Sequence, residues 1–323
     1  MKNFKFILLG LFSIYLMTSC SDDEMDLPQP QSYPEIVNGT FNFQNRDRIY
    51  SLHIPETFDG TQSAPLVIFL HGGGGNAQSA QNFTGFNDVS EQEGFLMLYP
   101  QAGFETATKS FVWADGRGLA PDKLGIDDVV FVNALVDYLV SEYNINQNRI
   151  YLCGFSNGSF LTQKIAFESN SRFAAIGTLG GTMHQSFFDT GKPNRAIPMV
   201  YVFGTDDPLV PYNGGYVSNN PDFELVVGVE TAVEYWRDNN NTQTTLSVRN
   251  MANINTNDNS TVTVFEYKDG DCNGSKVKFY KINGGGHTWP GVVVPNPLLG
   301  VTNLDINASQ ELWDFFEQFE LCL

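Results

Sequence analysis

The chain has 323 residues, with 18 basic and 36 acidic side chains that give it a net charge of −18. Such an acidic balance argues against a nucleic-acid partner and against an anionic membrane surface, because both would repel the chain. Neither the Cys/His spacing of a zinc site nor a phosphate-binding G-K-[ST] motif is present. We therefore expect no metal and no organic cofactor.

The N-terminus resembles an export signal. Lys2 and Lys5 precede an apolar run over 6–17 that is too short for a comfortable membrane span. The run ends in Leu-Met-Thr-Ser-Cys, which resembles a bacterial lipobox and implies cleavage before Cys20 and lipidation of its thiol. Residues 21–24 resemble the acidic tag of Bacteroidetes surface lipoproteins. The alternative is an ordinary secreted protein with a chance cysteine.

The predicted organisation has three parts. Residues 1–19 form a lipoprotein signal peptide, 20–36 a lipidated acidic tether rich in Pro and Gln, and 37–323 one folded domain. We expect a monomer at the cell surface, anchored to the outer membrane through the lipid on Cys20.

Strands and helices alternate along the domain. Strands are predicted at 40–43, 48–54, 65–70, 95–99, 149–153, 174–179, 199–203 and 277–282. Helices are predicted at 128–143, 160–167, 229–239 and 309–319, with strand-like pieces at 244–249 and 261–267. The pattern indicates an α/β fold: a mostly parallel, eight-stranded sheet with helices on both faces.

The sequence Gly-Phe-Ser-Asn-Gly at 154–158 lies between a predicted strand and a predicted helix. This is the context of a G-x-S-x-G nucleophile elbow, in which glycines let a tight turn form. Ser156 is the predicted nucleophile.

A serine nucleophile needs a histidine base, which is itself held by a carboxylate. In folds with this elbow the order along the chain is serine, acid, histidine. Of four histidines, only His287 follows the last predicted strand, within a glycine-rich loop. The acid should follow the strand at 199–203, where Asp207 is preferred and Asp206 remains the alternative, because spacing alone does not decide.

The reaction intermediate of such an enzyme carries an oxyanion, which backbone N–H groups stabilise. One donor is expected from Asn157, directly after the nucleophile. The other is expected from Gly73 or Gly72, in the His-Gly-Gly-Gly motif after the strand at 65–70. His71 is interpreted as structural.

The cysteines divide by context. Cys153 lies in the apolar strand before the elbow and is expected to be buried and inert. Cys272 and Cys322 remain, and export would place them where disulfides form. A bridge between these two cysteines is a hypothesis.

From about residue 39 to 319, the chain resembles the polyhydroxybutyrate depolymerase and feruloyl esterase group of α/β-hydrolases, of the carbohydrate esterase family one type. Matching stretches are LHGGGGNA, VWADGRG, GIDDVVFVNALVDYL, GFSNGS, FGTDDPLVPYNGG and GGGHTWPG. The resemblance implies an α/β-hydrolase catalytic domain and a triad of Ser156, Asp207 and His287.

The leading hypothesis is a serine esterase acting on feruloyl or acetyl groups of plant polysaccharide through an acyl-enzyme. Trp113, Phe155 and Trp289 are candidates for stacking on the substrate. A polyhydroxybutyrate or polyester depolymerase would use the same triad. The alternative from another class is a non-catalytic, glycan-binding lipoprotein.

Overall fold

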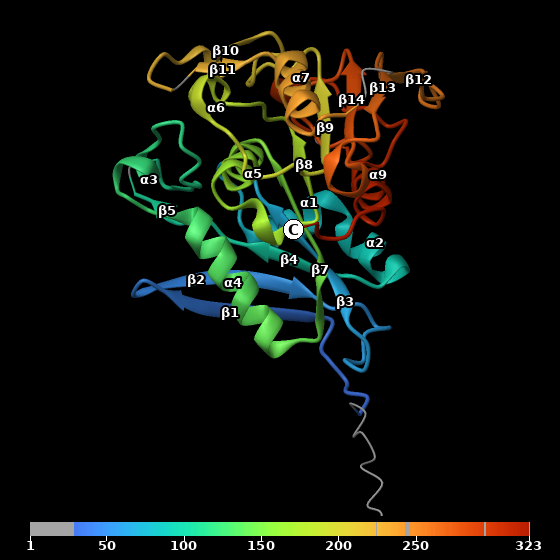
Figure 1. Cartoon of the computed structure of the whole chain (residues 1–323). Coiled ribbons are helices and arrows are strands. Elements are labelled where there is room, and N and C mark those ends of the chain that lie inside the picture. The colour runs from blue at the N-terminus through green and yellow to red at the C-terminus, as the bar shows by residue number, and fades with distance from the viewer. Residues whose placement is uncertain (1–28, 107, 224, 243–245, 294, 323) are drawn as a thin grey trace, which may run out of the picture.

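The computed structural model describes residues 29–322 except 107, 224, 243–245 and 294. Its main feature is a ten-stranded sheet (Figure 1). From edge to edge the strands are β1 (Ile36–Phe43), β2 (Arg46–His53), β4 (Leu96–Pro100), β3 (Ala64–Leu70), β7 (Ile145–Phe155), β8 (Ala175–Leu179), β9 (Met199–Gly204), β14 (Val277–Asn283), β13 (Thr261–Tyr267) and β12 (Ser247–Asn250).

The six central strands, from β4 to β14, are parallel, and two antiparallel strands extend the sheet at each edge. The mostly parallel α/β prediction is confirmed, but the count of eight strands is wrong. The two extra strands are β12 and β13, which were predicted only as strand-like pieces. In this geometry the carboxyl ends of the parallel strands meet at one edge, where active sites of open α/β sheets form.

The core lies on both faces of the sheet. Alternate residues of β3 point to opposite faces, so Leu66, Ile68 and Leu70 join one apolar cluster while Val67 and Phe69 join the other. The first cluster includes apolar side chains of α4 (Asp128–Glu142), α5 (Asn157–Glu168) and α7 (Val229–Asn239). The second includes those of α1 (Ala77–Thr84), α2 (Phe86–Glu93) and α9 (Ala308–Phe316).

The loops carry short elements, several of them near the carboxyl edge of the sheet. The helices are α3 (Ala120–Lys123), α6 (Gln185–Thr190), α8 (Asp271–Gly274), and the 3-10 turns η1 (Asn170–Arg172), η2 (Val217–Asn219) and η3 (Pro297–Leu299). Two small antiparallel pairs join β5 (Phe104–Glu105) to β6 (Ser110–Phe111) and β10 (Gly214–Tyr216) to β11 (Leu225–Val227).

The start of the folded domain differs from the predicted boundary at residue 37. Tyr33 packs against Phe58 and Tyr143, with ring centroids 5.1 and 5.8 Å apart. The carbonyl of Glu35 accepts a hydrogen bond from the amide of Ile54 at 2.8 Å. The aromatic ring of Tyr33 therefore attaches the end of the predicted tether to the domain. The signal peptide and Cys20 lie outside the described residues.

The C-terminus is attached by a disulfide between Cys272 of α8 and Cys322, 50 residues apart in the sequence. Cys153 is a buried free thiol in β7, and burial raises its pKa well above the usual range. A neutral thiol is a poor nucleophile, so this position agrees with an inert, structural cysteine.

Replacing both Cys272 and Cys322 by serine should lower the free energy of unfolding by about 2–4 kcal/mol, because the bridge restricts the unfolded chain. Thermal unfolding of wild type and double variant, each with and without reductant, would measure the effect. Reductant should bring wild type to the level of the variant and leave the variant unchanged. An equal effect of reductant on both proteins would contradict the assignment.

Candidate active site

Ser156 occupies the turn between β7 and α5 in a strained conformation, with φ of 53° and ψ of −117°. Left-handed φ values are unfavourable for a serine and are concentrated at functional sites. The flanking glycines allow the turn: a Cβ on Gly158 would lie 2.0 Å from the carbonyl oxygen of Leu70, and one on Gly154 would lie 2.4 Å from Gly158. The predicted elbow is therefore present in the structure.

His287 lies in the loop after β14 and is almost completely buried. Its Nδ1 is 2.6 Å from Oδ2 of Asp207, in the loop after β9. The other carboxylate oxygen of Asp207 accepts the amides of Leu209 and Val210, each at 2.8 Å. Because Oδ1 is held by these donors, Oδ2 faces the imidazole and favours the tautomer that carries its proton on Nδ1.

Asp206, the alternative acid, points elsewhere. Its side chain is exposed and accepts a hydrogen bond from the Thr205 hydroxyl at 2.9 Å. Its backbone amide donates to the carbonyl of Gly285. Asp206 thus supports the turn, and Asp207 is the carboxylate that contacts the histidine.

The glycine loop after β3 lies against the elbow. A Cβ on Gly72 would be 3.3 Å from Cβ of Ser156. Gly74 and Gly75 already donate their amides, to Phe111 and Gly72 respectively. The amides of Gly72 and Gly73, in contrast, donate no hydrogen bond to any other described residue.

Asn157 is the first residue of α5, where a helix leaves its amides without intrahelical partners. Its backbone N–H and those of the two loop glycines are thus free to face one oxygen beside Ser156. Such a set of donors can stabilise a developing negative charge.

Ser156 and His287 open into one cleft of about 660 Å³. Gly72, Gly73 and Asn157 line the same cleft, so it gathers the predicted nucleophile, base and oxyanion donors. It is also lined by apolar side chains that sequence reasoning missed: Leu119, Leu209, Val210, Val217, Phe223 and Leu299. Leu209 and Val210 closely follow Asp207, so their closeness to the predicted acid could have marked them as residues that line the cleft. The other apolar residues come from loops whose course depends on the tertiary structure.

Residues 49–197 match the profile of the family described as Esterase PHB depolymerase, where PHB is polyhydroxybutyrate. Over this segment, a little under half of the chain, the sequence is similar to that esterase family. Together with relatives that are named esterases, this similarity supports a carboxylic ester hydrolase.

Three relatives that are also named esterases are each 26% identical to this chain. NocK of Nocardia uniformis subsp. tsuyamanensis, named as an esterase, aligns over 84% of this chain and 79% of its own. The bifunctional acetylxylan esterase/xylanase XynS20E of Neocallimastix patriciarum aligns over 83% of this chain but 33% of its own. Feruloyl esterase C of Emericella nidulans aligns over 58% of this chain and 66% of its own. The chain thus spans a third of the second relative and less than two thirds of the third.

The fold is shared with a solved structure, an acetyl xylan esterase from Aspergillus awamori. The two superpose with a TM-score of 0.58 over 88% of this chain and 99% of the other, at 13% sequence identity. The fold is the α/β-hydrolase fold.

Two of the three predicted stacking residues are not in the cleft. Trp113 and Trp289 are fully buried. The Trp289 ring packs edge-on against Phe69 at 5.2 Å. Both indole N–H groups donate within the protein, from Trp113 to the carbonyl of His71 and from Trp289 to the hydroxyl of Ser309. The prediction was wrong for these tryptophans because large apolar rings with satisfied polar groups are favoured in the core.

Phe155 is half-buried and does line the cleft. Its ring lies 4.8 Å from that of His287, centroid to centroid. Phe155 is the one predicted stacking residue that a ligand in the cleft could contact.

His71 has a structural position behind the glycine loop. Its Nε2 accepts the amide of Ala102 at 3.1 Å, so Nδ1 carries the proton and donates to the carbonyl of Gly72 at 2.7 Å. Burial, with a smaller contribution from Arg48, lowers the pKa of His71 to about 4. The imidazole is thus neutral at physiological pH and holds the loop through both nitrogens.

This pKa predicts an acid-sensitive stability. Below pH 6.5 the unfolded chain binds a proton at His71 that the folded chain resists down to about pH 4, so stability falls as the pH falls through this window. Between pH 7 and 5 the loss should be about 2 kcal/mol. Urea unfolding at both pH values should show a loss in wild type that exceeds the loss in His71→Asn by this amount. Equal losses in the two proteins would refute the assignment.

Two further kinds of feature are absent from the described residues. No cluster of three or more His, Cys, Asp or Glu side chains is arranged to hold a metal ion. In the same part of the chain, no helix combines the length and the apolar surface that crossing a bilayer requires.

Proposed function

We propose that this chain hydrolyses carboxylic esters with Ser156 as nucleophile, His287 as general base and Asp207 as the carboxylate that orients the histidine. The observation that carries the proposal is the 2.6 Å contact between Asp207 and His287 at a cleft that also contains the strained Ser156. A carboxylate on Nδ1 keeps Nε2 free to accept a proton, which is the form a general base needs.

The chemistry follows in two halves. Nε2 of His287 takes the hydroxyl proton of Ser156 as Oγ attacks the ester carbonyl, and the resulting oxyanion is stabilised by the amides of Asn157 and Gly73 or Gly72. Collapse of this intermediate breaks the ester C–O bond, and the imidazolium gives its proton to the leaving alcohol. Water then attacks the acyl-enzyme by the same route and releases the acid.

The proposed substrates are feruloyl or acetyl esters on plant polysaccharide. Support comes from the names of two relatives, an acetylxylan esterase/xylanase and a feruloyl esterase. The largely apolar lining of the cleft suits an acyl group, and its volume of about 660 Å³ leaves space for part of a polymer.

The second candidate is depolymerisation of polyhydroxybutyrate or a related aliphatic polyester, which the family description favours. The same triad would serve it, because the reaction is also ester hydrolysis. The two candidates differ only in the groups on either side of the ester bond.

Parallel assays would separate the candidates. The soluble domain and its Ser156→Ala variant would be tested on methyl ferulate, acetylated xylan and a hydroxybutyrate oligomer. The proposal expects wild type to cleave one of the first two and the variant to cleave none. Preference for the oligomer would favour the polyester candidate. Equal inactivity of both proteins, also on a generic acetate ester, would point instead to glycan binding without catalysis.

We propose further that the full chain is exported and attached to the outer membrane at the cell surface, through a lipid on Cys20. Support comes from the lipobox-like sequence and the acidic residues after it. Mass spectrometry of the mature N-terminus, with Cys20→Ala as control, would test the proposal. An unmodified cysteine in wild type would refute it.

A further inference from the structure

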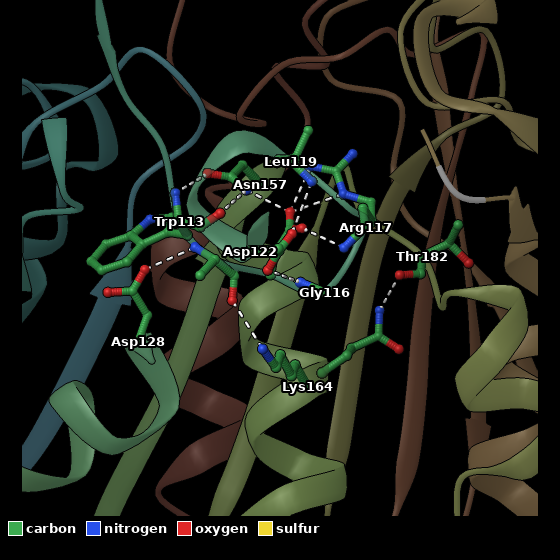
Figure 2. A network of polar contacts seen from close by, with 12 residues as sticks. Trp113, Gly116, Arg117, Leu119, Asp122, Asp128, Asn157, Lys164 and Thr182 are labelled. Carbon is green, nitrogen blue, oxygen red and sulfur yellow. Dashed lines mark hydrogen bonds and ion pairs between the residues drawn. The ribbon is translucent and has the colours of Figure 1, made fainter. Parts of the chain in front are cut away.

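The VWADGRG stretch, residues 112–118, is a motif to which the proposed reaction assigns no role. Its central residues Trp113, Ala114 and Asp115 are completely buried. The stretch passes beside the start of α5, as Figure 2 shows, with Asn157 turned toward the backbone of Trp113. Its contacts reach both segments that carry the expected oxyanion donors.

The first contact is with Asn157. The backbone amide of Trp113 donates to Oδ1 of Asn157 at 2.8 Å, and Nδ2 of Asn157 donates back to the carbonyl of Trp113 at 3.4 Å. The side chain of Asn157 is thereby held on both of its polar atoms. Because the expected oxyanion donor is the backbone N–H of this same residue, the contact restricts the position of that donor.

The second contact is with the glycine loop. The indole Nε1 of Trp113 donates to the carbonyl of His71 at 2.9 Å, and the indole and imidazole rings lie 5.0 Å apart. His71 directly precedes Gly72 and Gly73. One residue therefore joins the two separate segments of the oxyanion hole, through its backbone on one side and its side chain on the other.

The stretch itself is firmly held. The carboxylate of Asp115 accepts Nδ2 of Asn157 at 2.5 Å and is paired with Arg117 at 2.6 Å. The amide of Ala114 donates to Asp128 at 2.8 Å, and Asp128 forms a buried ion pair with Arg48 at 2.7 Å. Buried polar groups that are hydrogen-bonded in this way rigidify the structure around them.

We propose that Trp113 is a positioning residue that sets the distance between the two halves of the oxyanion hole, and that Asp115 steadies Asn157 in the same arrangement. This inference rests on the proposed serine mechanism. Trp113 does not touch the substrate; it acts through Asn157 and the glycine loop. The donors must match the oxygen of the tetrahedral intermediate, so a small displacement weakens transition-state binding more than substrate binding.

The test compares two tryptophans that each lose a buried indole hydrogen bond. Trp113→Phe removes the donor to His71 and keeps an aromatic ring. Trp236→Phe is the matched control, since Trp236 of α7 is equally buried and donates to Gln163 of α5 at 3.4 Å. Measurements are kcat and KM on p-nitrophenyl acetate, the inhibition constant of phenylboronic acid, which forms a tetrahedral adduct with an active serine, and the Tm.

Trp113→Phe should lower kcat about 10- to 100-fold, less than the loss of a whole oxyanion donor. KM should change less than about threefold, and phenylboronic acid should bind more weakly by a factor similar to the loss in kcat. Trp236→Phe should keep kcat and the inhibition constant within about twofold, whatever its Tm.

Asn157→Ala supplies a second variant if Trp113→Phe does not fold. It keeps the backbone N–H and the Asp115–Arg117 pair but removes the side chain by which Asn157 is held. The same split between kcat and KM is expected, again about 10- to 100-fold in kcat.

The inference is overturned if the folded variants lose Tm but keep kcat and phenylboronic acid binding within about threefold. Ser156→Ala separates this failure from failure of the mechanism. If that variant keeps its activity, the serine mechanism itself is wrong and this inference falls with it.

Discussion

Ser156→Ala should lower kcat/KM by at least about a thousandfold, because it removes the hydroxyl oxygen that forms the acyl-enzyme in the proposed reaction and leaves catalysis to the oxyanion donors and binding. Hydrolysis of p-nitrophenyl acetate by wild type and variant would measure the loss. The fold should persist, since alanine is smaller than serine at this half-buried position. A fluorophosphonate should add its mass to wild type and not to the variant.

The matched control is Ser141→Ala, on the exposed surface of α4, where the hydroxyl donates to the carbonyl of Tyr138. Its activity should equal that of wild type. If the Ser156→Ala variant retained more than about a tenth of wild-type activity, the assignment of Ser156 as the nucleophile would be wrong.

Asp207→Asn should lower kcat by about 10³- to 10⁴-fold through the tautomer of His287. The amides of Leu209 and Val210 both donate to Oδ1, so the carboxamide oxygen of the variant should stay on them. Its NH₂ group then faces Nδ1 of His287 and donates to it. The imidazole must carry its own proton on Nε2, where it cannot accept the serine proton.

Asp206→Asn is the control for this substitution, because it changes the neighbouring residue in the same way. Its side chain is exposed and contacts Thr205 rather than the histidine, so kcat should stay within about twofold of wild type. Steady-state kinetics of the two variants at pH 7 would decide. If Asp206→Asn were the more damaged of the two, the assignment of Asp207 would be wrong.

The elements with strong local patterns were predictable. Buried parallel strands appear as short apolar runs, and α7 occupies 229–239 as its apolar spacing predicts. The last two strands of the sheet, β13 and the edge strand β12, were harder to recognise. β12 is exposed along its length and has little pattern. Helices α1 and α2 were not predicted at all, because their sequences AQSAQNFT and FNDVSEQE are mostly polar.

The elbow is encoded within five consecutive residues, because its steric requirement for glycine around a strained serine is local. The expected oxyanion donors are backbone groups of short motifs and are likewise readable from the chain. The choice between Asp206 and Asp207 is different. The two carboxylates are adjacent and chemically identical, and only the course of the loop after β9 turns one of them toward His287.

The roles of the tryptophans, like the choice between the two aspartates, could not be determined from the local sequence. An indole is equally suited to stack on a ligand or to fill a core, so residue type and position near a motif could not distinguish these roles. Packing against Phe69 places Trp289 in the core, and hydrogen bonds to His71 and Asn157 place Trp113 behind the glycine loop that follows β3. Motifs with local steric and backbone requirements were determined by the sequence itself. Which side chains face the cleft was decided by contacts between residues far apart in the chain, since only tertiary packing defines the inside of a site.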